Sequence, residues 1–173
     1  MKTLKNNAKV SILAVCVVCL SMVVYAGQEE WLTDIKAAKE LARDKNLPIL
    51  ADFAGTDWCG WCIKLDQEVF SQDAFKAYAK TNLVLFLADY PHFKQLPAET
   101  VKQNKTLSQQ YRVEGFPTVL LLDANGSELA RTGYRPGGSK EYVDYLVKLI
   151  VGLKKDASTS APTNAPPEKV HVL

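Results

Sequence analysis

The chain has 173 residues, of which 47% are hydrophobic and 23% are charged. These proportions are ordinary for a globular protein, and the length suits one domain. They exclude a wholly disordered chain, a collagen-like repeat and a membrane protein with several spans, because only one stretch is strongly apolar. The formal net charge of +2 provides no electrostatic basis for nucleic-acid binding, and we expect no nucleic-acid partner.

Residues 1–26 have the pattern of an export signal. Lys2, Lys5 and Lys9 form a positively charged start, and the following residues up to Val24 are apolar apart from two serines. A small residue, Ala26, then provides a cleavage position. We therefore expect a signal peptide that is removed after Ala26.

Two alternatives to cleavage stay open. Residues 10–26 could remain as a membrane anchor, although a span needs roughly 20 apolar residues and this run is shorter. Cys16 could carry a lipid, although Val15 is bulky for a lipid-attachment motif. After cleavage, 18 basic and 19 acidic residues would remain, which is a net charge of −1. We expect an exported protein, periplasmic or extracellular, with no membrane contact after cleavage.

Residues 27–155 alternate between helical and strand patterns. In chain order, the patterns predict a helix (34–46), a strand (49–54), two helices (59–69 and 71–80), a strand (83–88), a short helix (106–111), a strand (119–122), its hairpin partner (128–132) and a last helix (139–152). Residues 90–105 contain two prolines and little periodicity, and we expect an insertion loop there.

This order of elements predicts an α/β fold. Crossover connections and a closing hairpin are typical of a three-layer sandwich, in which helices flank a mixed central sheet. Residues 156–173 are small, polar and rich in proline, and such a segment buries too little apolar surface to fold. We expect a disordered tail there.

The four cysteines form two CxxC pairs. Cys16 and Cys19 lie in the signal and would leave with it, so the mature chain would keep Cys59 and Cys62. A bridge across a two-residue gap removes little chain entropy and would stabilise the fold weakly. The second pair therefore favours redox chemistry over a structural disulfide.

The context of the second pair supports this interpretation. Cys59 follows a buried strand and a short turn, at the start of a predicted helix and beside solvent. Unpaired N–H groups at a helix start stabilise a thiolate, which is the attacking species in thiol exchange. Cys62 lies one turn deeper, where it can form a disulfide with Cys59 and resolve a mixed disulfide.

Other interpretations of the pair stay open. It could be an inert buried pair or part of a metal site, but a tetrahedral zinc site needs four ligands. The mature chain adds only His92 and His171 to the two cysteines. We expect no metal and no cofactor.

Two motifs resemble those of the thioredoxin superfamily, and in particular those of its secreted bacterial thioredoxin-like proteins. The segment 52–62, DFAGTDWCGWC, is similar to the family's active site, and residues 115–118, GFPT, are similar to its cis-proline loop. The resemblance covers about Trp31 to Val151. It implies a thioredoxin-like fold, with a redox disulfide between Cys59 and Cys62.

The resemblance also implies roles for the residues around the dithiol. Pro117 would be cis and pack beside the two sulfurs, and Phe116 would offer backbone groups to an extended substrate peptide. Trp58, Gly60 and Trp61 would complete the substrate-binding surface.

A buried acid on the strand before the motif moves the proton of the second cysteine in this family. Asp52 matches it, provided that the strand register turns its side chain toward Cys62. The turn before Trp58 is one residue longer than the family pattern, so Asp57 is a competitor, although we expect Asp57 to be exposed. The lysine that often faces the buried acid is not evident in residues 83–87.

The sequence therefore predicts a secreted thiol–disulfide oxidoreductase that acts on protein thiols and disulfides with an unidentified redox partner. Cys59, Cys62 and Asp52 are the expected catalytic residues. The alternative is a non-catalytic client-binding or chaperone-like module on the same fold. The direction of electron flow stays open, because reductases, oxidases and isomerases share these residues.

Overall fold

The computed structural model describes residues 31–159, with side chains through Lys155. Its elements are α1 (Ile35–Lys45), β1 (Ile49–Ala54), α2 (Gly60–Leu65), the π-helical turn η2 (Asp66–Phe70), α3 (Asp73–Asn82), β2 (Val84–Asp89), α4 (Ala98–Gln110), β3 (Thr118–Leu122), β4 (Glu128–Thr132) and α5 (Gly138–Thr159). The predicted order of helices and strands is confirmed. The expected signal, 1–26, and residues 160–173 of the expected tail lie outside the described residues.

The strands form one mixed sheet in the order β2-β1-β3-β4. β1 pairs with β2 in parallel and with β3 antiparallel, and the β3–β4 hairpin completes the sheet. A single bridge between Leu32 and Phe86 extends the edge beyond β2. All six residues of β1 are buried, which explains why the strand is apolar at every position except Asp52 instead of alternating between apolar and polar residues.

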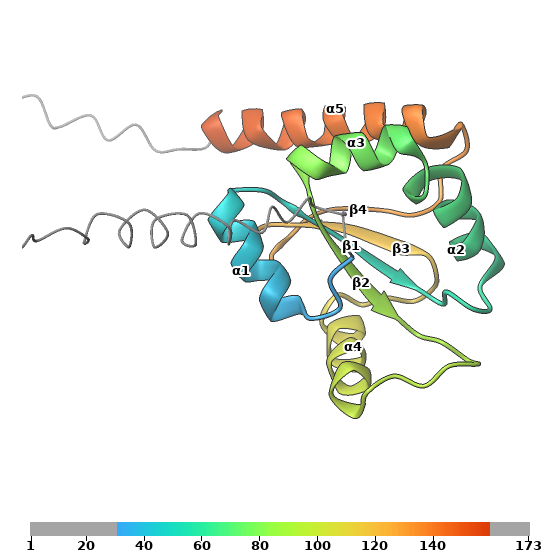
Figure 1. Cartoon of the computed structure of the whole chain (residues 1–173). Helices are drawn as coiled ribbons and strands as arrows, with labels where there is room; N and C mark the ends of the chain where they lie inside the picture. The colour runs from blue at the N-terminus through green and yellow to red at the C-terminus, as the bar shows by residue number, and fades with distance from the viewer. Residues whose placement is uncertain (1–30, 160–173) are drawn as a thin grey trace, which may run out of the picture.

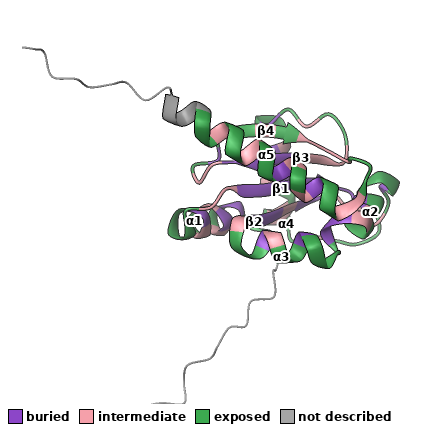
Figure 2. Ribbon diagram, turned by 90° about the horizontal axis from the view of Figure 1, so that it is seen from above, coloured by how far each residue is buried: buried purple, intermediate pink, exposed green. Residues whose placement is uncertain are grey.

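Helices cover both faces of the sheet, as the three-layer prediction required (Figure 1). On one face, side chains of α1 and α4 pack against alternate residues of β1 such as Ala51 and Phe53. On the other face, side chains of α2, η2, α3 and α5 pack around Leu50. The buried residues follow the central strands between these helical layers (Figure 2).

Two helix boundaries differ from the predictions by more than two residues. α4 begins at Ala98, inside the expected insertion loop. The sequence pattern does not predict this start, because one of the buried positions of the helix holds the polar Asn104 and interrupts the apolar period. Asn104 is satisfied there, since its side-chain amide donates to the Asp89 carbonyl at 2.9 Å. α5 continues past Gly152 to Thr159, because Leu153 packs against the core and outweighs the weak helix propensity of glycine. Helix therefore extends into the first residues of the expected tail.

Among the described residues, no helix combines the length and the apolar character that a membrane span requires.

Candidate active site

The two cysteines lie where β1 gives way to α2. Cys59 is the N-cap of α2, and its backbone N–H donates to the Gly55 carbonyl at 2.9 Å. Its sulfur accepts the backbone N–H of Cys62 at 3.2 Å. The sulfurs of Cys59 and Cys62 are bonded in a disulfide, and their Cα atoms lie 5.2 Å apart. The local fold thus gives Cys59 the environment of a helix start.

Cys59 is less open to solvent than the sequence suggested. Its exposed fraction is 7%, close to the 5% of Cys62. Both cysteines form a small buried cluster with Ala54, against which Leu87 and Phe116 pack. The expectation that Cys59 lies beside solvent is therefore wrong for the disulfide form, because neighbouring apolar side chains close over it.

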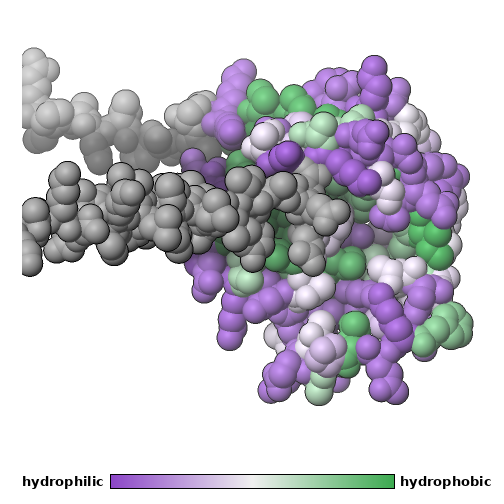
Figure 3. Space-filling view, in the orientation of Figure 1, coloured by the Kyte–Doolittle hydropathy of each residue, from purple (hydrophilic) through white to green (hydrophobic). Residues whose placement is uncertain are grey.

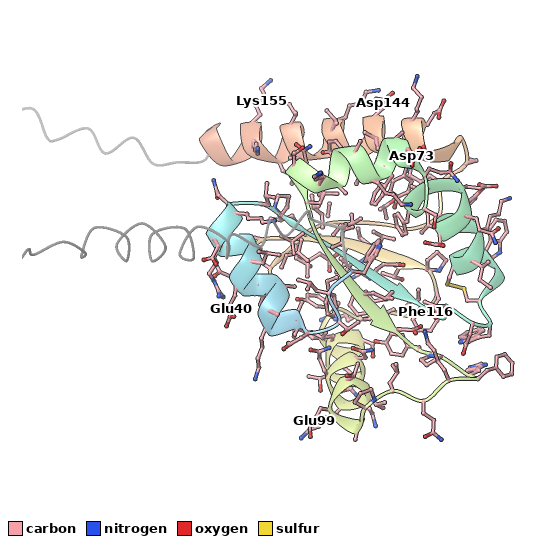
Figure 4. The ribbon with its side chains drawn as sticks, in the orientation of Figure 1. Glu40, Asp73, Glu99, Phe116, Asp144 and Lys155 are labelled. Carbon is pink, nitrogen blue, oxygen red and sulfur yellow. A yellow bond between two sulfur atoms is a disulfide. The ribbon has the colours of Figure 1, made fainter. Side chains whose placement is uncertain are left out.

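Phe116 packs against the dithiol from the loop before β3, where Pro117 follows it in the chain. The bond between them is cis, as the resemblance implied. The Phe116 ring stacks on Tyr90 at a centroid distance of 4.8 Å and meets the edge of Trp58 at 6.1 Å. Figure 4 shows the labelled Phe116 near the disulfide, which is drawn as a yellow bond. The loop therefore supplies one wall of the site.

Trp58 supplies a second wall. Its indole N–H donates to the Tyr90 carbonyl at 2.7 Å, and its ring stacks on His92 at 4.2 Å. Beneath the ring lies Gly55, where any Cβ would overlap the indole atoms. A glycine at this position is therefore required for the indole to lie in this orientation.

Trp61 packs against a different set of side chains from those around Trp58. Its ring contacts Tyr134 at a centroid distance of 5.1 Å, and the ammonium of Lys64 lies 5.3 Å from the Trp61 ring and 5.2 Å from the Tyr134 ring. The Tyr134 hydroxyl donates to Glu68 at 2.7 Å, which holds the group together. Gly60 leaves the surface between the tryptophans open, since no atom lies within 4 Å of its Cβ position.

Asp52 is buried on the same side of β1 as Cys62. Both residues line a cavity of about 290 Å³, together with Asp66 and Gln67. Asp52 is 7% exposed, and its Oδ1 atom has no hydrogen-bond partner. Burial, together with the negative charges of Asp66 and Asp89, raises the pKa of Asp52 to about 8. No lysine lines this cavity to balance the acid.

Asp57 holds the loop after β2. Its carboxylate accepts the backbone N–H groups of His92 at 2.9 Å and Phe93 at 2.8 Å. Partial desolvation raises the pKa of Asp57, but these hydrogen bonds outweigh it and lower the pKa below its ordinary value. Asp57 is therefore a structural clamp and does not share the cavity with Cys62.

Sequence reasoning missed Tyr90 and His92, which both contact Trp58. Their segment has no helical or strand pattern, and the sequence predicts an insertion loop there. One signal in the sequence is the longer turn before Trp58, because this turn contains Asp57, whose carboxylate binds the segment.

No group of three or more His, Cys, Asp or Glu side chains that could hold a metal ion occurs in the part of the chain that the structure describes.

The sheet, the CxxC disulfide at a helix start and the cis-proline loop together define a thioredoxin-fold protein with a redox-type cysteine pair. Residues 35–148 match the family model described as "Thioredoxin-like domain", and the chain belongs to this family.

The comparisons with individual proteins agree. The chain is 36% identical over 120 residues to "Disulfide bond reductase DsbH" of Chlamydia pneumoniae, covering 69% of this chain and 72% of that protein. It also resembles the solved structure "DsbH Oxidoreductase", with a TM-score of 0.68, 29% identity and coverage of 87% of this chain and 94% of that one. A thioredoxin from Thermus thermophilus shares the fold, with a TM-score of 0.52, 16% identity and coverage of 73% and 92%.

Proposed function

We propose that this chain reduces disulfides of exported proteins, with Cys59 as the attacking thiol and Cys62 as the resolving thiol. That it is a thiol–disulfide oxidoreductase follows from its family and from its similarity to a disulfide bond reductase. The single observation that carries the proposed roles is the Cys59–Cys62 disulfide at the start of α2. The name of the relative supports reduction as the direction of the reaction.

The exchange begins from the reduced dithiol. The Cys59 thiolate, stabilised by the N–H groups at the start of α2, attacks one sulfur of a client disulfide and releases the other as a thiolate. The resulting mixed disulfide joins the client to Cys59. Cys62 then attacks the Cys59 sulfur and releases the second client thiol. The client disulfide is reduced to two thiols, and the dithiol is oxidised to the observed disulfide.

Asp52 is suited to accept the proton of Cys62 in the second step. The two residues line one cavity, and the pKa of Asp52 is raised to about 8 by burial and by nearby negative charge. A group with a pKa near the working pH exchanges protons efficiently in both directions. Ionised Asp52 takes the proton as the Cys62 sulfur attacks, and the protonated form returns it in the reverse reaction.

We also propose that clients are proteins, that an unidentified redox partner returns the disulfide to the dithiol, and that the chain is exported. The support for export is the pattern of residues 1–26. The support for protein clients is the apolar surface formed by Trp58, Trp61 and Phe116 around the disulfide.

Trapping of the mixed disulfide tests the cysteine roles. The Cys62→Ser variant should accumulate client proteins bonded to Cys59, because the resolving thiol is missing, whereas Cys59→Ser should trap none. The unsubstituted protein should reduce insulin in the presence of dithiothreitol. If no adduct forms and no insulin is reduced, the function is not disulfide reduction. Client binding that survives Cys59→Ser/Cys62→Ser would indicate the binding-module alternative.

A further inference from the structure

Exposed aromatic side chains occur beside the dithiol and in the loop after β2. Among the described residues, the large hydrophobic side chains that are exposed include three aromatic ones, Trp58 at 39%, Trp61 at 59% and Phe93 at 83%. Trp58 and Trp61 flank Cys59 in sequence. Phe93 joins them through its neighbour His92, whose ring contacts both the Phe93 ring at 6.3 Å and the Trp58 ring. An exposed aromatic group that is joined through ring contacts to a side chain beside the reactive disulfide indicates a binding surface.

The segment that carries Phe93 is held in place at several points. Asp57 accepts two of its backbone N–H groups, including that of Phe93. The ammonium of Lys94 pairs with Asp89 at 2.7 Å, and Asp89 also accepts hydrogen bonds from Thr56 in the β1–α2 turn. Phe93 is thus presented to solvent from an ordered backbone. A preordered apolar group loses little conformational entropy when a partner covers it.

Charged groups beside Phe93 already have partners within the protein. The Asp57 carboxylate is occupied by backbone N–H groups, and the Lys94 ammonium by Asp89. Apolar contact is therefore what this surface offers to a partner. In Figure 1 the β2–α4 loop and the β1–α2 turn project from the same end of the molecule, and Figure 3 shows apolar atoms exposed at that end.

The burial of Cys59 limits how a client disulfide reaches it. In the disulfide form 7% of Cys59 is exposed and Phe116 packs against it, so a client disulfide must reach Cys59 past the Phe116 ring. An extended polypeptide segment satisfies this requirement, because it can insert its cystine while its neighbouring residues lie on Phe93.

We propose that Phe93 is a specificity determinant that binds a bulky apolar side chain next to the disulfide of an extended client segment. This inference rests on the proposed function and adds the substrate class to it: disulfides flanked by large apolar residues are preferred over those flanked by small polar ones.

The test compares three disulfides with the reduced protein in single-turnover reactions. Two are cystine peptides of equal length, one with Leu and Phe beside the cysteines and one with Ser and Gly there. The third is glutathione disulfide. Phe93→Ala should lower the second-order rate constant for the apolar peptide about fivefold or more, as expected for loss of an aromatic anchor. The other two rate constants should stay within about twofold.

Two further variants control the result. Phe93→Trp should keep the preference for the apolar peptide, because it preserves a large aromatic group. Val101→Ala removes another exposed apolar side chain, 53% exposed, from α4 and should change none of the three rate constants.

Three outcomes would overturn the inference. Phe93→Ala could leave the preference for the apolar peptide intact, or it could slow all three reactions equally, which would make Phe93 a structural residue. It could also dissociate a dimer in analytical ultracentrifugation without altering the preference, which would make this surface a contact between two copies of the chain. If the unsubstituted protein reacts with none of the three disulfides, the proposed function itself fails and this inference falls with it.

Discussion

The imidazole of His92 lies flat against the indole of Trp58, with ring centroids 4.2 Å apart and planes within 3° of parallel. Beside this stack, the Asp57 carboxylate binds the His92 backbone, 35 residues along the chain. The turn that positions Cys59 and the loop after β2 therefore form one structural unit. Changes on either side of this unit should affect the other.

The first prediction concerns the space beneath Trp58. Gly55→Ala should place a methyl group in the indole ring and displace it from His92 and from the Tyr90 carbonyl. We expect a loss of about 1–3 kcal/mol in the free energy of unfolding, measured by urea denaturation.

Gly152→Ala is the matched control for this substitution. Nothing lies within 4 Å of its Cβ position, and Gly152 is inside α5. It should stabilise the protein by up to about 1 kcal/mol, because alanine favours the helix. Equal effects of the two substitutions would contradict the proposed packing of Trp58 on Gly55.

The second prediction concerns the clamp formed by Asp57. Asp57→Ala should accelerate hydrogen–deuterium exchange at the amides of His92 and Phe93 by roughly tenfold, because both lose their acceptor. Asp34→Ala, which removes a comparable acceptor from Lys36 at the start of α1, should leave these two amides unchanged.

The clamp also has a defined pH dependence. The hydrogen bonds from backbone N–H groups lower the pKa of Asp57 below its ordinary value of 3.8. The clamp therefore contributes its full stability at any pH above 3.8. This contribution is lost only as the pH falls through the lowered pKa. Unchanged exchange at His92 and Phe93 in the alanine variant would show that other contacts hold the loop.

The third prediction concerns the buried acid. The pKa of Asp52 is about 8 in the folded protein, whereas its ordinary value is 3.8. Its contribution to stability is therefore fully present below pH 3.8 and is lost as the pH rises through about 8. In the oxidised protein, Asp52→Asn should raise the free energy of unfolding by on the order of a few kcal/mol at pH 8.

The same variant should change stability much less at pH 4, where Asp52 is protonated in the folded state. Glu40→Gln, on the exposed side of α1, should change stability by less than about 0.5 kcal/mol at either pH. Asp52→Asn should also slow oxidation of the dithiol. The rate of this oxidation should lose the part of its pH dependence near pH 8 that arises from Asp52. A change in stability that is the same at pH 4 and pH 8 would show that Asp52 is not held protonated by burial.

Much of the architecture could be predicted because it depends on neighbours along the chain. The buried strand β1 is apolar at every position except Asp52, and the turn after it places a CxxC pair at a helix start. The spacing of Cys59 and Cys62 allows a disulfide in any helix that begins between them. These features are properties of short segments, so the amino-acid order was sufficient to identify them.

The surroundings of the disulfide could not be predicted in the same way. Three features of the site depend on contacts between separate segments of the chain. They are the shared cavity of Asp52 and Cys62, the stack of Trp58 on His92 and the packing of Phe116 against Cys59. Such contacts depend on how the sheet and its connecting loops pack, and a periodic pattern within one segment carries no information about them. The reactive cysteine pair could therefore be identified from a short segment of sequence. Its burial and the position of its proton acceptor depend on the tertiary structure.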